Sequence, residues 1–107
     1  MGKIKISDMI NALTHYNLEH VEFPLEPLME NGAEYMGLAD DYKRKLFINK
    51  EKPFSEKRIT VVHEIIHAVH YLRGDFDTYT SKKIEKLVDR ETDTIMKRYF
   101  KEELNEE

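Results

Sequence analysis

The residues of this chain best suited to chemistry are two histidines and a glutamate, His63, Glu64 and His67, which form the pattern H-E-x-x-H. On a helix, residues four apart lie one turn above each other on the same face, so both imidazoles can reach one metal ion. The glutamate between them can take a proton from a metal-bound water. We therefore expect this stretch to hold a Zn²⁺ ion and to catalyse hydrolysis.

The sequence around the motif predicts a buried helix over about residues 56–73. Ser55 is a favoured N-cap and Phe54 can pack against Ile59, while Gly74 stands where a left-handed C-cap is expected. Apolar residues point in nearly every direction around this helix, as is typical of a buried one. A buried imidazole is costly unless it is hydrogen-bonded, paired or bound to metal. Two core histidines bonded to backbone carbonyls are the less favoured interpretation.

A catalytic zinc usually takes three protein ligands, and the chain has no cysteine, so the third ligand should be a histidine or a carboxylate. A last helix over about residues 82–102 carries four acidic candidates: Glu85, Asp89, Glu91 and Asp93. Asp89 and Asp93 are one turn apart, which suits a ligand followed by a carboxylate that orients a ligand histidine. Glu85 and Asp89 have the same spacing and suit the same two roles one turn earlier. We expect Asp89 to be the third ligand, with Glu91, which lies closer to the apolar stripe, and then Glu85 as alternatives.

Two further residues are candidates for supporting roles near the metal. His70 lies on the same stripe as the motif histidines but another turn along, so we expect it to line the site or to orient a ligand rather than to bind the ion. Tyr79 follows Gly74 in a polar loop that ends at Thr80 or Ser81, either of which can cap the last helix. Tyr79 and His70 are both candidate donors to a transition-state oxyanion.

The N-terminal part of the chain predicts a helix over about residues 8–17, capped by Ser7. The segment 21–27 contains two prolines, so we expect an extended connector there. His15 and His20 flank this connector, and we expect both at the surface.

Residues 33–49 predict a hairpin, with strands at 33–39 and 43–49 around the turn Asp40-Asp41-Tyr42. The order helix, strands, helix, helix indicates an α+β fold in which a small antiparallel sheet packs on helices. The length of 107 residues fits one domain, residues 1–107.

Composition narrows the possible partners. The net charge is −4 without a basic cluster, so we expect no direct contact with nucleic acid. The chain has no apolar run long enough to span a bilayer and no signal-peptide pattern, which argues against a membrane partner. The lack of cysteine fits a cytoplasmic protein. The oligomeric state is not indicated.

Three segments together resemble the ImmA/IrrE family of zinc metallopeptidases, gluzincin-like proteins of mobile elements, phages and stress responses. They are the end of the hairpin at 46–49, the entry into the motif helix at 57–64, and the stretch 89–96 of the last helix. The resemblance implies that His63 and His67 bind zinc, that Glu64 is the general base, and that Asp89 is the third ligand with Asp93 one turn on. It also implies a protein or peptide substrate, such as a regulatory protein of a phage or mobile element.

One departure from the family supports an alternative function. The family usually has glycine where this chain has Ile66, a bulky side chain next to the second motif histidine. In a domain this small, a zinc ion kept for stability alone would give a non-catalytic binding or regulatory module with a zincin fold. The intact Glu64 favours an enzyme, because structural zinc needs no general base. A hydrolase of non-peptide amides would use the same residues.

Overall fold

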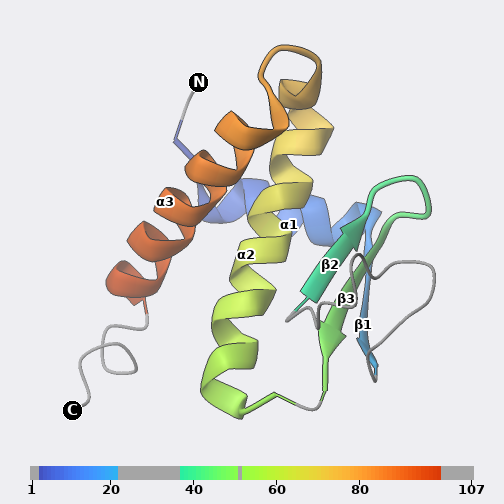
Figure 1. Cartoon of the computed structure of the whole chain (residues 1–107), viewed down its shortest axis with the longest axis vertical. Helices are drawn as coiled ribbons and strands as arrows, with labels where there is room; N and C mark the ends of the chain where they lie inside the picture. The colour runs from blue at the N-terminus through green and yellow to red at the C-terminus, as the bar shows by residue number, and fades with distance from the viewer. Residues whose placement is uncertain (1–2, 22–36, 51, 100–107) are drawn as a thin grey trace.

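The computed structural model describes residues 3–21, 37–50 and 52–99. In these residues the chain forms, in order, α1 (Ile6–His15), β1 (Asn17–Val21), β2 (Gly37–Asp40), β3 (Lys45–Asn49), α2 (Phe54–Arg73), the 3-10 turn η1 (Asp75–Asp77) and α3 (Ser81–Tyr99). Helix α2 is central, with α3 on one side, the sheet on the other, and α1 crossing behind it (Figure 1). The expected α+β fold, with a small sheet packed on helices, is confirmed. None of the described helices is long and apolar enough to cross a membrane.

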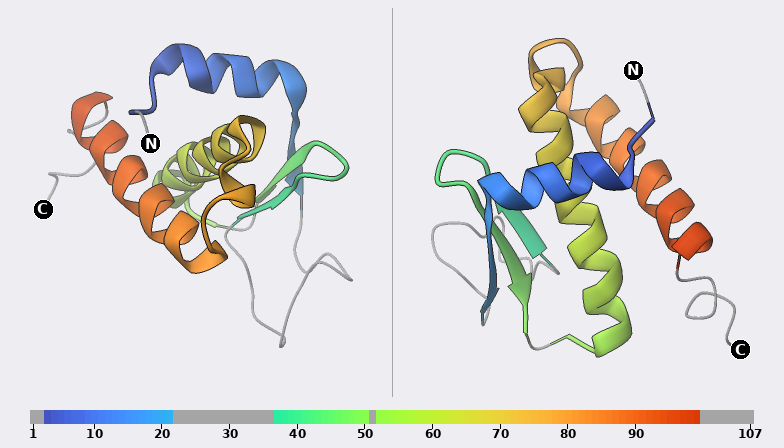
Figure 2. Two further views of the ribbon diagram at one scale, coloured as in Figure 1. Left: turned by 90° about the horizontal axis from the view of Figure 1, so that it is seen from above. Right: turned by 180° about the vertical axis from the view of Figure 1, so that it is seen from behind.

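The described strands form one mixed sheet in the order β1-β3-β2. Strands β2 and β3 are the expected antiparallel hairpin, with Gly37 opposite Ile48, whereas β1 pairs with β3 in parallel, with Asn17 opposite Lys45 (Figure 2). The expectation of a purely antiparallel sheet is therefore wrong. Strand β1 buries none of its side chains, and even Leu18 is 47% exposed, so β1 lacks the buried apolar positions that usually mark a strand. Its position depends on backbone pairing with β3, which is a nonlocal contact.

The element boundaries differ from the expected ones by a few residues. Helix α1 begins at Ile6, and Lys5 rather than Ser7 is its N-cap, because the Lys5 N–H donates to the carboxylate of Asp8 over 2.8 Å. The hairpin turn extends to Arg44, which has a φ of 57°, so β3 starts two residues later than expected. The expected residues 33–36 of the first hairpin strand and most of the connector at 21–27 lie outside the described residues. His15 and His20 are exposed.

Helix α2 begins with Pro53 as its N-cap, so Ser55 lies inside the first turn. The Phe54 ring makes a cation–π contact, in which the Arg58 guanidinium lies 4.7 Å from the ring centre. Gly74 is the left-handed C-cap as predicted, with a φ of 81°.

Helix α3 and the hydrophobic core surround the central helix α2. At the start of α3 the Thr80 hydroxyl accepts a hydrogen bond from the backbone N–H of Lys83 over 3.1 Å, which confirms Thr80 as a cap. Ile66 is wholly buried in the hydrophobic core, together with apolar residues of α2 itself and of the other elements: Met9, Ala12, Leu46, Ala68, Val69, Ile84, Val88, Ile95 and Met96. The expected last residues of the helix, 100–102, lie outside the described part.

Gly37 brings the start of β2 into close contact with α2, and this contact can be tested by mutation. A Cβ atom at residue 37 would lie 2.5 Å from Thr60 Cγ2 and 3.0 Å from the Phe47 carbonyl oxygen. We expect Gly37→Ala to lower the free energy of unfolding by about 1–3 kcal/mol, since overpacking must move the strand or the helix. Urea denaturation measures the loss.

Thr60→Ser removes the clashing Cγ2 and is the matched control. Alone it should cost about 1 kcal/mol, the value of one buried methyl group. Combined with Gly37→Ala, it should recover part of the stability that Gly37→Ala loses. A Gly37→Ala variant as stable as the wild type would contradict this close approach of β2 to α2.

Candidate metal centre

The H-E-x-x-H residues lie in the middle of α2, at the border between the core and the solvent. The side chains of His63 and His67 are 26% and 16% exposed, and Glu64 is buried at 7% exposure. Glu64 therefore lies deepest, and the two imidazoles lie closer to the surface, where α3 passes. The motif forms the helical face that the sequence predicts.

A single carboxylate of α3 faces both motif histidines. Glu85 Oε1 lies 3.9 Å from His63 Nε2, and Glu85 Oε2 lies 3.7 Å from His67 Nε2. Both distances are too long for hydrogen bonds. In a tetrahedral zinc site with bonds of 2.0–2.2 Å, two ligand atoms are separated by about 3.4 Å. Each motif histidine therefore has a Glu85 oxygen at nearly this separation, but the two oxygens are different atoms, and the ligand atoms that lie within 4.8 Å of one another belong to His63, Glu85 and Asp89. One ion shared by Glu85 and both histidines would require these side chains to move inward.

Asp89 approaches the other nitrogen of the first histidine. Its Oδ1 lies 3.5 Å from His63 Nδ1, and the ligand atoms of His63, Glu85 and Asp89 lie within 4.8 Å of one another. A carboxylate beside the second nitrogen of a metal-bound imidazole typically fixes its tautomer and orientation. The geometry thus favours Glu85 as the third ligand and Asp89 as the orienting carboxylate. From the sequence we expected Asp89 as the ligand and Asp93 as the orienting carboxylate; the pair Glu85 and Asp89 lies one turn earlier on α3.

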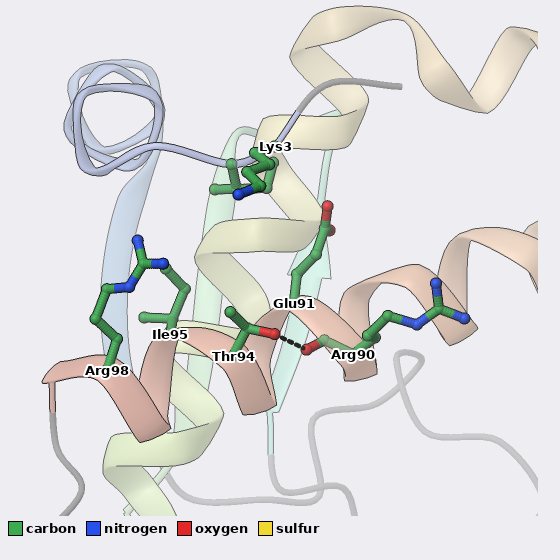
Figure 3. Close-up of a pocket in the computed structure, with 7 residues that line it drawn as sticks. Lys3, Arg90, Glu91, Thr94, Ile95 and Arg98 are labelled. Carbon is green, nitrogen blue, oxygen red and sulfur yellow. Dashed lines mark hydrogen bonds between the residues drawn. The ribbon is translucent and has the colours of Figure 1, made fainter.

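Two of the other expected acids make different contacts. Asp93 pairs with Lys97 on the exposed face of α3 at 3.0 Å. Glu91 Oε1 lies 2.6 Å from Nε2 of His70. Figure 3 shows the Glu91 side chain extending from α3 alongside α2. Both carboxylates therefore have partners other than the motif histidines.

The His70 ring is wholly buried, and both of its nitrogens face carboxylates outside the motif. Its Nδ1 lies 2.8 Å from Asp75 Oδ2, on the opposite side of the ring from Glu91. Burial alone lowers the pKa of His70, but the hydrogen bonds to Glu91 and Asp75 raise it by more, so the net shift is upward. We had not singled out Asp75 from the sequence. The signal was its position directly after the C-cap glycine, within reach of the last turn of α2.

Tyr79 is partly buried against the core, and the Lys83 ammonium lies 4.5 Å from the centre of its ring. None of the contacts described for Tyr79 joins it to the motif residues, so nothing in the described part supports its expected role as an oxyanion donor.

The electrostatics of the motif favour a cation. Burial raises the pKa of Glu64 to about 8, and the negative charges of Glu85 and Asp41 add to this effect. Burial lowers the pKa of His67, although Asp41 and Glu85 act in the opposite direction. A neutral imidazole is the form that binds metal ions. The influence of Asp41 was not foreseen, because only folding brings the hairpin turn near α2.

The donor set also fits a zinc ion. Within the described residues, His67 Nδ1 is buried without a hydrogen-bond partner, and its ring centre lies 5.0 Å from that of Phe76. His67 is therefore held by ring packing, and its Nε2 is the nitrogen available to a ligand. Two imidazoles and a carboxylate are a common donor set for catalytic zinc.

Two hollows have both Ile59 and His63 in their linings. One has a volume of about 260 Å³ and is lined by Gly37, Ile59, Thr60, His63 and Glu64. The other, of about 240 Å³, is lined by Ile59, His63, Asp89, Thr92, Asp93 and Met96. A third hollow, of about 170 Å³, lies between the N-terminal segment and α3, and none of the motif residues lines it (Figure 3). The first two leave room for a substrate beside the motif.

No protein-family model, curated protein or solved structure gives a significant match to this chain. The resemblance to the ImmA/IrrE family therefore stays a prediction, and the functional interpretation depends on the residues and their geometry.

The assignment of the third ligand predicts a clear order among alanine variants. Glu85→Ala should lower zinc affinity by more than about 100-fold, since it removes a ligand, whereas Asp89→Ala should lower it by about 10–100-fold, the usual effect of an orienting residue. Asp93→Ala removes an acid from the same helix and should stay within about threefold of the wild type, because an exposed charge is well screened. Competition with a chromogenic chelator measures the affinities. If Asp89→Ala loses more affinity than Glu85→Ala, Asp89 is the ligand.

Proposed function

We propose that this protein is a zinc-dependent metallopeptidase of the H-E-x-x-H type. The observation that carries the proposal is the approach of the Glu85 carboxylate to Nε2 of both His63 and His67, with Glu64 buried beside them. A Zn²⁺ ion held by these three side chains would lower the pKa of a bound water and polarise the scissile carbonyl.

Glu64 acts as the general base in this proposal. It accepts a proton from the attacking water and passes it to the leaving amine. The carboxylate must be ionised for the first of these transfers. Its buried position disfavours the charged form, and positive charge nearby favours it. A structural zinc site would need no such carboxylate, so Glu64 supports catalysis over a purely structural ion.

The edge of the sheet is the proposed binding surface for an extended peptide. Among the described strands, β2 is an edge strand, and it lies on the side of the sheet next to α2 (Figure 1). Peptides commonly bind by adding a strand to such an edge. A peptide paired with β2 would pass the hollow between Gly37 and Glu64. The resemblance to the ImmA/IrrE family supports a protein substrate, such as a regulatory protein of a phage or mobile element, and a cytoplasmic location.

The non-catalytic alternative depended on Ile66 crowding the metal site. Ile66 is 0% exposed and belongs to the core cluster that includes Val62 and Val69. Its side chain packs in the protein interior. This observation does not favour a binding module over an enzyme.

Glu64→Gln separates catalysis from metal binding. The variant should keep its fold and about one zinc per chain, since the ligands remain, but lose at least about 100-fold of the hydrolysis rate because the general base is gone. Mass spectrometry of a proteome-derived peptide library, incubated with each zinc-loaded protein, measures cleavage.

Glu56→Gln makes the same side-chain change at an exposed position of α2 that lines neither hollow, and it should cleave like the wild type. A chelator should abolish cleavage by the wild type, and added zinc should restore it. Two results would contradict the proposal: no cleavage of any peptide by the zinc-loaded wild type, or cleavage by Glu64→Gln at the wild-type rate.

A further inference from the structure

We infer that His70 is a positioning residue for the metal centre, whose contact with Glu91 holds α3 in the register that presents Glu85 to the two motif histidines. The inference rests on the proposed function. It adds a role for a histidine that binds no metal in that proposal.

The His70 ring is enclosed between two carboxylates, those of Asp75 and Glu91. Its side chain is 0% exposed, and those of Asp75 and Glu91 are 17% and 19% exposed. Both ring nitrogens lie within 2.8 Å of a carboxylate oxygen, an arrangement that favours an imidazolium donating to both acids. Charge-assisted bonds of this kind are short and directional. Losing one partner of such a buried group leaves an uncompensated charge.

The contact with Glu91 joins the two helices that supply the ligands. His70 follows His67 by three residues on α2, and Glu91 follows Glu85 by six on α3. At a rise of 1.5 Å per residue, the contact lies about 5 Å and about 9 Å along the respective helices from these ligands. It therefore fixes α3 less than two turns from the carboxylate that faces the metal site.

Apolar packing alone specifies the position of α3 less sharply. Its buried apolar side chains, which are Ile84, Val88, Ile95 and Met96, pack in the core through nondirectional contacts. A metal site requires its ligands to be held within about 0.5 Å, so a small slide or rotation of α3 matters. The 2.6 Å contact between His70 and Glu91 supplies that precision. The facing pairs at the metal site, at 3.5–3.9 Å, do not hold the helices together.

The two partners of His70 provide a matched comparison. Both are acids at hydrogen-bond distance from the same ring, but Glu91 lies on α3 and Asp75 lies on η1. If His70 has a purely structural role, losing Glu91 and losing Asp75 should change the zinc affinity to a similar extent. A positioning role predicts that losing Glu91 weakens zinc binding more than losing Asp75 does.

The experiment measures zinc affinity by chelator competition for the wild type and for His70→Ala, Glu91→Ala, Glu91→Gln and Asp75→Ala, with circular dichroism to verify the fold. Loss of global stability does not by itself change the zinc affinity of molecules that remain folded. We expect His70→Ala and Glu91→Ala to weaken zinc binding about 10–100-fold and Asp75→Ala less than about threefold. Glu91→Gln can still accept the hydrogen bond, so it should recover most of the affinity that Glu91→Ala loses.

The possible failures are distinguishable. If the wild type binds no zinc, the proposed function fails and the inference fails with it. If the wild type binds zinc and the folded Glu91→Ala variant binds it equally well, or Asp75→Ala loses as much affinity as Glu91→Ala, only the positioning role is overturned. If His70→Ala does not fold, the comparison of Glu91→Ala, Glu91→Gln and Asp75→Ala still decides.

Discussion

The structure depends on one constraint, which is that α2 must serve as the centre of the core and also carry the polar motif. Val62, Ile66 and Val69 on this helix are buried, and Glu64 between them is almost as deeply enclosed. Burying ionisable groups is unfavourable unless other groups compensate them. The neighbours of α2 must therefore supply partners for polar groups as well as apolar contacts. Helix α3 supplies both.

The sequence of α3 shows how one helix meets both requirements. Its buried residues Ile84 and Val88 are each followed directly by an acid, Glu85 and Asp89. Adjacent helical residues are about 100° apart, so these acids lie at the rim of the buried face rather than opposite it. The side chains of Glu85 and Asp89 are 54% and 71% exposed, yet both reach toward His63. The apolar stripe that attaches α3 to the core thereby places the acids over the motif.

The sequence predicted the features that depend on local chemistry, which include the motif helix, its Gly74 cap and the β2–β3 hairpin. It did not predict β1, because the parallel pairing of β1 with β3 depends on backbone groups far apart in the chain. For the third ligand the sequence favoured Asp89, whereas the structure places Glu85 opposite both motif histidines and Asp89 opposite His63 alone. One-turn spacing fits Glu85 with Asp89 as well as it fits Asp89 with Asp93, and only the rotation of α3 against α2 separates the two pairs. That rotation is a property of tertiary packing.

The separation between polar atoms distinguishes a metal ligand from a structural clamp on the same helix. His63, His67 and His70 all have carboxylates of α3 opposite them, so spacing and partner type do not separate their roles. At His70 the partner atoms are at 2.6 and 2.8 Å, which is direct hydrogen bonding with no room for an ion. At His63 and His67 the distances to Glu85 are 3.9 and 3.7 Å, too long for a hydrogen bond and close to the separation of two ligands across a zinc ion. The hydrogen bond between His70 and Glu91 forms whether or not the motif histidines hold an ion. It therefore restrains α3, and with it the position of Glu85 opposite His63 and His67.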